Sequence, residues 1–517
     1  MKRFFGRALW RNLLAISFVI SEIAALMLLV AYAASYYYLV YFLSLLANAL
    51  VVISLVSRDV NPEFKITWLV VVIFLPFVGG LLYIMFYSRR LSRAETRLSK
   101  RIAELHDGSR AEERDASVSL SNLEALAKLD TAAAGQAMSL LRDDTYSKLY
   151  CDSSIKYFPL GEQMFESLLS DLRAAERFIF LEYFIIHDGE MWRQIFAVLK
   201  EKVREGIEVR IIYDDLGSMS SLPEELGREC EKIGIRCVPF GRVTPSITSA
   251  HNNRDHRKIC SIDNKIAYTG GVNISDEYIN KIERFGHWKD GGVRIEGRGA
   301  TGFTRLFLVN YSLAAKCEED PSPYLDEDYP VLSDGGFYIP FGDGPAPLSP
   351  GYTAKNAIMN MINQSQSYLY VTTPYLVIDY DLTEALRNAA KRGVDVRIIT
   401  PGIPDKKVVK IMTKSAYPYL LAGGVRIFEY AEGFIHEKTF LSDGKIGLIG
   451  SVNLDYRSLV HHFEDALWIY GSSELAFVRE ELLKTMKSCR EIDERDARLS
   501  FIERCIRGFV KFFAPLL

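Results

Sequence analysis

The chain opens with long apolar runs that carry almost no charge. Between Arg11 and Arg58 the only charged residue is Glu22, and a further uncharged run covers residues 66–88. A helix that crosses a bilayer needs about 20 apolar residues, so the first run is long enough for two crossings and the second for one. The pattern predicts a membrane anchor over residues 1–90 with two to three transmembrane helices.

The charges beside these runs leave their orientation in conflict. Basic residues cluster ahead of the first run and again just after residue 88, and both clusters favour the cytoplasmic side of a membrane. Three full crossings would put the clusters on opposite sides. We expect the bulk of the chain in the cytoplasm, so either the N-terminus lies outside or one early segment does not cross. A cleaved signal peptide is the alternative for the first run, but that run is too long and another follows at once.

Beyond residue 150 the apolar positions switch between period 2 and period 3.6, which is typical of alternating strands and helices. A strand, an amphipathic helix that ends at a glycine, and a second strand follow one another, and the same plan returns later in the chain. The strands are expected at 177–183, 209–213, 367–371 and 396–399, and the helices at 191–204 and 382–391. Strand–helix–strand units favour parallel pairing, with helices on both faces of the sheet.

The repeat predicts an α/β fold with two pseudo-symmetric halves, each a mixed, largely parallel sheet flanked by helices, after an N-terminal transmembrane helical segment. We expect the halves at residues 151–330 and 331–517, and a juxtamembrane helical linker at 91–150, which is rich in Ala, Leu, Glu and Arg. Residues 498–513 mix bulky apolar and basic side chains. They predict a C-terminal amphipathic helix that lies either on an anionic lipid surface or against the domain.

The composition excludes several classes of protein. Hydrophobic residues make up 49% of the 517 positions and charged residues 25%, which excludes a disordered chain and a low-complexity fibre. The net charge of −3 disfavours a globally basic nucleic-acid binder. None of the seven cysteines forms a C-x-x-C pair, so free thiols in a reducing compartment are favoured over a zinc or thioredoxin-like site.

One constellation of polar residues occurs twice, with the spacing H-x-K-x4-D-x6-G-[GS]-x-N. The ten positions are His256, Lys258, Asp263, Gly271 and Asn273 in the first copy and His436, Lys438, Asp443, Ser451 and Asn453 in the second. A single histidine on a strand is usually structural, and a single aspartate at a turn is usually only a turn residue. Five matched positions in both halves favour a functional site.

The spacing also predicts a hairpin within each copy. Residues 263–264 are Asp-Asn and residues 443–444 are Asp-Gly, and such pairs between apolar runs are typical of two-residue loops. A two-residue loop sets His256 opposite Gly271 and His436 opposite Ser451. We therefore expect each glycine or serine beside the histidine of its own copy, with the asparagine just beyond.

A carboxylate follows each copy in a similar context. Asp290 and Glu464 both lie shortly before an apolar strand. A carboxylate that orients an imidazole is a common acid–base arrangement. We expect each carboxylate to contact the histidine of its own half.

These residue types suit the transfer of a phosphodiester. The two lysines and the two asparagines, with Gly271 and Ser451 beside them, form a binding site for a phosphate group. One neutral histidine attacks phosphorus and forms a covalent intermediate, while the other, protonated, gives a proton to the leaving alkoxide and then accepts one from the incoming hydroxyl. The lysines supply the positive charge, so the reaction requires no metal and no other cofactor.

The paired H-x-K-x4-D motif resembles the mark of the phospholipase D superfamily. Within it the chain is most similar to the bacterial cardiolipin synthases, through strings such as residues 180–186, 213–217, 253–258, 271–278 and 453–458. The resemblance implies that two phosphatidylglycerol molecules give cardiolipin and glycerol, with His256 as the nucleophile and His436 as the acid and base. It also implies a multi-pass protein of the bacterial cell membrane whose partners are phosphatidylglycerol and anionic lipid, without nucleic acid; a homo-oligomer stays open.

Several alternatives share the same catalytic residues. A hydrolytic phospholipase D and a phosphatidylserine synthase differ from a cardiolipin synthase only in the acceptor. A nuclease would show basic grooves interleaved with aromatic residues and would not need spans. A non-catalytic membrane scaffold would not need intact His, Lys and Asn in both copies.

Overall fold

The structure is a computed structural model that describes residues 17, 20–24, 27, 34–58, 61–86, 91–219, 226–242, 253–325, 329, 332–349, 351–498, 500, 501, 503, 504 and 508. Two compact units can be distinguished. The chain up to Arg89 belongs to the first, which we call the N-terminal unit, and Arg90–Arg242 with Asn252–Arg507 make up the second, which we call the α/β unit.

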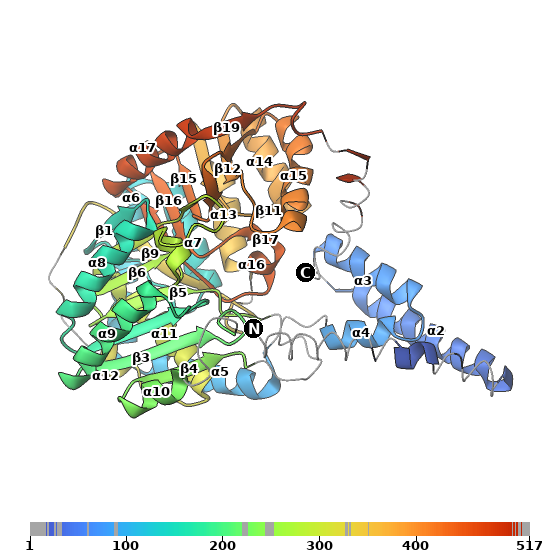
Figure 1. Cartoon of the computed structure of the whole chain (residues 1–517), viewed down its shortest axis with the longest axis horizontal. Helices are drawn as coiled ribbons and strands as arrows, with labels where there is room; N and C mark the ends of the chain where they lie inside the picture. Colours follow the sequence, from blue (N-terminus) through green and yellow to red (C-terminus); the bar gives the residue numbers. More distant parts are fainter. Residues whose placement is uncertain are drawn as a thin grey trace. The chain divides into compact units, whose positions relative to one another are not determined.

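The N-terminal unit contains α2 (Ala34–Val56), α3 (Pro62–Phe74) and α4 (Gly79–Phe86) (Figure 1). Within the described part of the chain, one helix, over Tyr38–Val56, is long and apolar enough to cross a membrane. The described part of the apolar run at 66–88 is divided between α3 and α4. The predicted first span lies mostly outside the described residues.

The predicted juxtamembrane linker forms three helices that belong to the α/β unit. They are α5 (Arg93–Asp107), α6 (Arg110–Leu129) and α7 (Thr131–Asp143). On α6, Asp115 forms a buried ion pair with Arg305 at 2.9 Å, and on α7, Gln136 donates to Gln364 at 2.8 Å. These contacts reach both halves of the unit.

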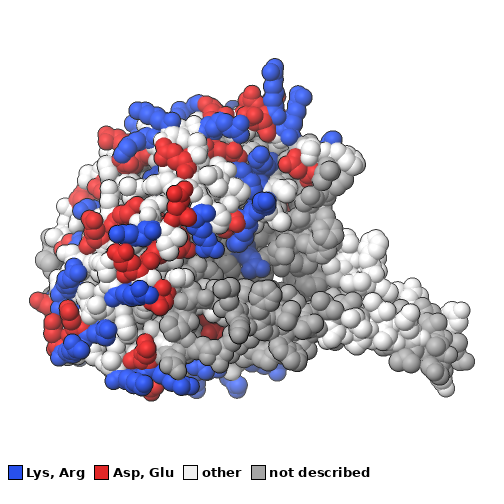
Figure 2. All heavy atoms as spheres, viewed as in Figure 1, with Lys and Arg blue, Asp and Glu red and all other residues white. Residues whose placement is uncertain are grey.

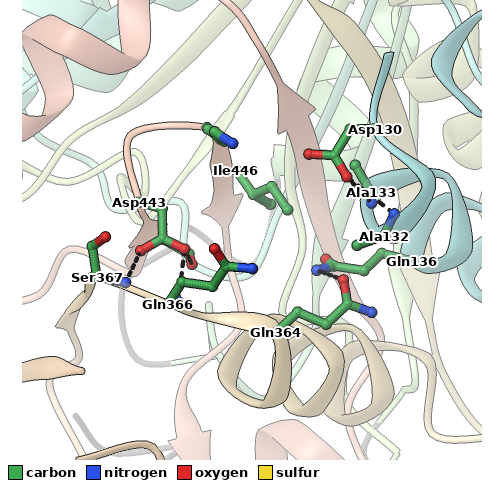
Figure 3. Close-up of a pocket in the computed structure, with 11 residues that line it drawn as sticks. Asp130, Ala132, Ala133, Gln136, Gln364, Gln366, Ser367, Asp443 and Ile446 are labelled. Atoms are coloured by element: carbon green, nitrogen blue, oxygen red, sulfur yellow. Dashed lines mark hydrogen bonds between the residues drawn. The ribbon is translucent and has the colours of Figure 1, made fainter. Parts of the chain in front are cut away.

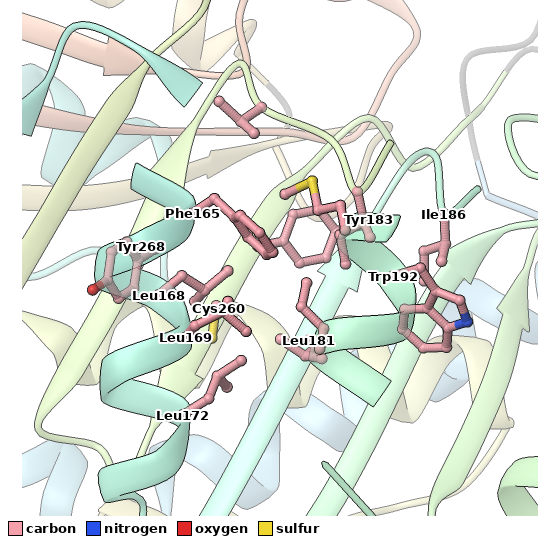
Figure 4. Close-up of a cluster of buried hydrophobic side chains, with 14 of the residues drawn as sticks. Phe165, Leu168, Leu169, Leu172, Leu181, Tyr183, Ile186, Trp192, Cys260 and Tyr268 are labelled. Atoms are coloured by element: carbon pink, nitrogen blue, oxygen red, sulfur yellow. The ribbon is translucent and has the colours of Figure 1, made fainter. Parts of the chain in front are cut away.

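The first half is built on a seven-stranded sheet in the order β1-β8-β6-β5-β2-β3-β4. Its strands are β1 (Ser153–Phe158), β2 (Phe178–Tyr183), β3 (Glu208–Asp214), β4 (Arg236–Phe240), β5 (Lys258–Ile262), β6 (Ile266–Gly270) and β8 (Gly292–Gly297). Helices α8 (Gly161–Ala174), α9 (Glu190–Arg204), α10 (Leu226–Lys232), α11 (Ala300–Ala315) and α12 (Ser322–Leu325) flank it. Figure 4 shows Leu168, Leu169 and Leu172 of α8 facing Leu181 of β2 in the core of this half.

The second half repeats this plan on an eight-stranded sheet in the order β19-β13-β12-β10-β15-β16-β18-β9. Its strands are β9 (Phe337–Asp343), β10 (Tyr368–Thr372), β12 (Asp395–Pro401), β13 (Arg426–Tyr430), β15 (Thr439–Ser442), β16 (Ile446–Gly450), β18 (Glu464–Tyr470) and β19 (Cys489–Ile492). Its helices are α13 (Thr353–Gln364), α14 (Tyr380–Lys391), α15 (Lys407–Leu421), α16 (Tyr456–Val460) and α17 (Glu474–Lys487).

The fold class predicted from the sequence is confirmed, with one correction to the strand directions. Parallel pairing among these strands is confined to β2-β3-β4 and β10-β12-β13. The remaining pairs are antiparallel, so the two sheets are mixed but not largely parallel. In each half the parallel pairs belong to the strand–helix–strand unit. The two strands of the hairpin, and the strands that pair next to the hairpin in the sheet, run antiparallel to their neighbours.

The two sheets share one hydrophobic core. Ile259, Ala267 and Ile295 of the first sheet are buried together with Ile449 and Leu467 of the second. Hydrophobic burial therefore fixes the two halves against each other, and side chains from one half can reach the site of the other. The predicted boundary at 330/331 and most of the predicted C-terminal helix at 498–513 lie outside the described residues.

Candidate active site

Each copy of the repeated motif forms a hairpin, but the predicted register is wrong by one residue. Ile262 pairs with Ile266 and Ser442 with Ile446, so each loop has three residues. Asp263 and Asn264 both have positive φ, as does Asp443, and the N–H of the third loop residue bonds back across the loop at 3.0 Å. His256 is therefore not set opposite Gly271, nor His436 opposite Ser451.

The two motif aspartates lie at the turns, away from the histidines. Asp263 accepts hydrogen bonds from the N–H groups of residues 176–178 at 2.7–2.8 Å, and Asp443 accepts them from residues 366–368 at 2.7–2.9 Å. Figure 3 shows the Asp443 contacts in a surface pocket that is also lined by Gln136 and Gln364. This geometry fastens the hairpin to the start of the adjacent strand, so both aspartates act on the fold and not on the reacting atoms.

The carboxylate that contacts His256 comes from the other half of the chain. His256 Nδ1 lies 3.0 Å from both carboxylate oxygens of Glu464, the first residue of β18. The backbone makes the same crossing, because His256 N–H donates to the Phe463 carbonyl at 2.9 Å and Phe463 N–H donates to the Arg254 carbonyl at 2.8 Å. The prediction that Glu464 orients His436 is therefore wrong.

His436 shows the reciprocal arrangement. Its Nδ1 lies 2.6 Å from Asp290 Oδ2, and its N–H donates to the Lys289 carbonyl at 2.7 Å. Strands β7 (His287–Lys289) and β14 (Gly433–Ile435) pair in parallel just before these residues. Each histidine is thus oriented by the carboxylate of the opposite half, a long-range pairing that no local pattern indicates.

The two carboxylates have different surroundings. Glu464 accepts hydrogen bonds from Ser458 at 2.6 Å and from Ser451. Burial opposes the ionised form of Glu464, but the interactions with His256 and His462 hold its pKa well below its usual range. Asp290 accepts from Gly291 N–H at 2.8 Å, and burial raises the pKa of Asp290 to about 6 against the opposing charge of Lys438.

Gly271 and Ser451 contact the carboxylates, where a phosphate contact was predicted. Ser451 Oγ donates to Glu464, the partner of His256. A Cβ atom on Gly271 would lie 2.1 Å from Asp290 Oδ1, so a side chain there would collide with the partner of His436. The two carboxylates therefore explain the difference between serine and glycine at this position. Glu464 accepts a hydrogen bond from the Ser451 hydroxyl, whereas Asp290 occupies the space that a side chain at Gly271 would fill.

Both imidazoles are neutral in the protein without substrate. Burial lowers the pKa of His256 to about 3, against the opposing charge of Glu464. Burial, with the nearby ammonium groups of Lys438 and Lys258, lowers the pKa of His436 well below its usual value. Since Lys258 acts on both rings, the two motifs share one electrostatic environment.

The two lysines converge on this environment. Burial lowers the pKa of Lys258 to about 8 and that of Lys438 to about 7, and the Lys258 charge contributes to the second shift. Each ammonium donates to the carbonyl of its own histidine, and Lys438 Nζ lies 2.9 Å from His436 Nδ1. Because the Lys258 charge lowers the pKa of Lys438, the two buried cations repel each other, and an anion bound by both would relieve that repulsion.

The two motif asparagines differ in their partners. Asn273 Oδ1 accepts from Ile185 N–H at 3.1 Å and its amide donates to the Tyr278 hydroxyl at 2.7 Å, so this side chain positions the wall of the site. Asn453 Oδ1 is shielded from solvent and has no hydrogen-bond partner in the described structure. The spacing predicted the same role for both asparagines, but their hydrogen-bond partners differ.

Aromatic rings that the sequence analysis did not select line both histidines. Phe184 lies 5.0 Å from His256, and Tyr278 and Trp288 lie 5.5 and 5.6 Å from His436, measured between ring centroids. His462 lies 5.4 Å from His256. Trp288 and His462 both stand two residues before the orienting carboxylate, and this matched position is the signal that could have found them.

One cluster at the site has the composition of a metal site. Donor atoms of His256, His462 and Glu464 lie within 4.8 Å of one another. The oxygens of Glu464 already accept hydrogen bonds from Ser451, Ser458 and His256. We therefore assign Glu464 to orienting His256 rather than to binding a metal.

The acidic residues next to the first motif also serve the fold. Asp214 accepts from Arg254 at 3.0 Å and from Asp255 N–H at 2.9 Å, directly before His256. A fully buried ion pair of this kind fixes the backbone on which His256 is carried. Taken together, the site offers two oriented neutral imidazoles and two ammonium groups, a combination suited to nucleophilic attack on a bound phosphate ester.

Comparisons with known proteins place the chain in a family. A family model described as "cardiolipin synthase, PLD-like domain" matches residues 168–283 and 358–486, and one described as "phospholipase D-nuclease N-terminal" matches residues 46–86. Cardiolipin synthase of Geobacillus sp. is 30% identical over 90% of this chain and 91% of its own length. Cardiolipin synthase 2 of Staphylococcus epidermidis is 29% identical over 92% of this chain and 96% of its own.

Two further similarities extend the comparison. An uncharacterized protein of Streptococcus mutans is 43% identical over 71% of this chain and 80% of its own length. The crystal structure of a phosphatidylserine synthase of Haemophilus influenzae covers 70% of this chain with a TM-score of 0.54 and 15% identity. At that identity the likeness concerns the fold alone.

Proposed function

Because the chain belongs to the cardiolipin synthase-like proteins of the phospholipase D superfamily, we propose that it transfers a phosphatidyl group from one phosphatidylglycerol molecule to another, giving cardiolipin and glycerol. The observation that carries this proposal is the pair of crossed contacts, His256 with Glu464 and His436 with Asp290. They orient two imidazoles beside two lysines, and the relatives that share nearly the whole chain are cardiolipin synthases.

In the first step His256 acts as the nucleophile. Glu464 accepts a hydrogen bond from Nδ1–H, which keeps the proton on Nδ1 and leaves the lone pair of Nε2 free to attack phosphorus. The N–P bond forms as the bond from phosphorus to the glycerol oxygen breaks. The ionised carboxylate stabilises the positive charge that develops on the ring, and Lys258 and Lys438 stabilise the charge on the phosphate oxygens.

His436 acts as the acid and then as the base. The anionic diester favours a protonated His436, which gives its proton to the departing glycerol. The ring then accepts the proton of the incoming hydroxyl, whose oxygen attacks phosphorus as the N–P bond breaks. Asp290 suits this role because its pKa is raised to about 6, so the pair exchanges a proton near neutral pH more readily than the strongly ionised Glu464 pair.

The activity is tested by incubating the purified protein with phosphatidylglycerol alone. We expect cardiolipin and glycerol in equal amounts. Phosphatidic acid as the sole lipid product would instead identify a hydrolase that uses the same site. A base quench, which the bond between phosphorus and histidine survives, should leave the label on His256 when the lipid is labelled at phosphorus; label on His436 alone would reverse the two roles.

The setting of the site favours a lipid substrate over nucleic acid. Helix α2 provides a described segment long and apolar enough for a membrane anchor. Figure 2 shows Lys and Arg interspersed with Asp and Glu over much of the visible face of the α/β unit. We place the α/β unit in the cytoplasm, where free thiols are stable.

A further inference from the structure

The apolar run that follows α2 is folded as two short helices joined by a tight turn. Helix α3 has 13 residues and α4 has 8, which correspond to about 20 Å and 12 Å of helix at 1.5 Å per residue. A bilayer core is about 30 Å thick. Neither helix is therefore long enough to cross a membrane.

The two helices lie antiparallel and in contact. The rings of Trp68 and Tyr83 are 5.5 Å apart at 77°, and both side chains are buried. In a continuous helix these two residues would be about 22 Å apart. A Cβ on Gly79 would lie 2.5 Å from the Val71 carbonyl oxygen, so the absence of a side chain there allows α4 to turn back against α3.

The turn satisfies its own backbone through a side chain of α2. The Val72 carbonyl faces position 76, where proline has no N–H to donate. The Asn48 amide donates to that carbonyl at 3.2 Å and to the Pro76 carbonyl at 2.8 Å. A Cβ on Gly80 would lie 2.6 Å from Asn48 Oδ1, so glycine leaves room for the asparagine. Non-helical backbone at membrane depth is tolerated only where such internal partners exist.

The outer surface of the hairpin is apolar. Ile66 is 57% exposed and Ile73 64% on α3, and Ile84 is 68% exposed on α4. The partner that fits exposed aliphatic side chains around an internally satisfied turn is the acyl region of a bilayer. The short helices limit that contact to one leaflet.

We propose that α3 and α4 form a re-entrant hairpin that enters and leaves the membrane on the same face, stabilised by Asn48 of α2. The polar residues before Pro62 and the basic start of α5 then lie on one side. If the first apolar run crosses twice, as its length predicts, both basic flanks reach the cytoplasm. The conflict between the charges and three full crossings disappears.

Cysteine labelling of the full chain in cells tests the topology. We would introduce Ser57→Cys before the hairpin and Ala94→Cys after it, both at exposed positions, and treat intact and permeabilised cells with a membrane-impermeant maleimide. Peptide mass spectrometry identifies the labelled site, so the native cysteines stay in place. We expect both positions to be protected in intact cells and labelled after permeabilisation. Labelling of only one of them in intact cells would overturn the hairpin, whereas labelling of both would keep the hairpin and contradict the cytoplasmic placement.

A second measurement tests the fold-back without reference to sidedness. The pair Trp68→Cys with Tyr83→Cys should form a disulfide on mild oxidation, detected as a cross-linked peptide. The matched control pair, Ile66→Cys with Ile84→Cys, places both thiols at outward positions and should remain uncross-linked. Equal yields for the two pairs would contradict the packed hairpin. Neither measurement depends on enzymatic activity, so their failure is distinct from failure of the proposed transfer reaction.

Discussion

His256 Nδ1 lies 3.0 Å from the carboxylate of Glu464, a residue 208 positions later in the chain. The reciprocal contact joins His436 to Asp290. Each half of the α/β unit therefore supplies one imidazole and the carboxylate that orients the other imidazole. Because of these crossed contacts, each half needs the other to orient its histidine. The two carboxylates serve different histidines, so their roles can be tested by separate substitutions.

The Glu464→Gln and Asp290→Asn variants should fail in different steps. Glu464→Gln removes the charge that supports attack by His256, so formation of the phosphohistidine should slow by about 100-fold or more. Asp290→Asn impairs proton delivery by His436. A phosphatidyl ester with a good leaving group, such as nitrophenol, needs no proton on departure and should restore the first step of Asp290→Asn but not of Glu464→Gln. Rescue of both variants, or of Glu464→Gln alone, would contradict the assigned roles.

The lysine pair predicts loss of activity at alkaline pH. An ammonium group is charged below its pKa, and burial lowers the pKa of Lys438 to about 7 and of Lys258 to about 8. Binding of the anionic diester should therefore weaken as pH rises through 7 to 8, seen as a fall in kcat/KM, which reports the free enzyme. Lys438→Arg keeps its charge at that pH and should move the alkaline limb upward, even at a lower overall rate. A wild-type limb above pH 10 would contradict the prediction.

The motif aspartates should matter for stability more than for chemistry. Asp263→Asn replaces one acceptor oxygen with a donor that faces Glu176 N–H, and we expect the free energy of unfolding to fall by about 2 kcal/mol. Asp443→Asn makes the same change at a more exposed turn and should cost less. Chemical denaturation of the two variants measures both effects. A loss of kcat as large as that of Glu464→Gln, with unchanged stability, would return these residues to the catalytic set.

Some features of the fold and of the site can be predicted from residues that are close together in the sequence, and others cannot. The strands around residues 178–183 and 368–372, and the grouping of the motif histidines and lysines, follow from short-range periodicity and spacing. The hairpin register does not, because Asp-Asn and Asp-Gly pairs occur in two-residue and three-residue loops alike. The partners of His256 and His436 could not be predicted from one sequence, since both carboxylates have similar contexts and the choice depends on how the two sheets pack.

The break in the apolar run at 66–88 is also a feature that the local sequence pattern did not predict. Hydropathy registers residues 66–88 as one apolar run because it does not weigh Pro76, Gly79 and Gly80 as a turn. Those residues become informative only with Asn48, a polar side chain inside the preceding apolar run whose partner lies in another helix. A polar residue of this kind is better evidence for a broken segment than the length of the run is for a crossing.

Asn48 therefore provides the sharpest test of the membrane unit. Asn48→Leu keeps the size of the side chain but leaves the Val72 and Pro76 carbonyls without their donor, and each unsatisfied buried group costs about 1–3 kcal/mol. We expect a fall of about 2–4 kcal/mol in the free energy of unfolding, measured by SDS titration in bicelles, with a lower yield of the 68/83 cross-link. Ser44→Ala is the matched control, because Ser44 donates to the Tyr41 carbonyl within its own helix at 2.8 Å. If both variants lost the same small amount, Asn48 would not be holding the turn, and the break at Pro76 would need another explanation.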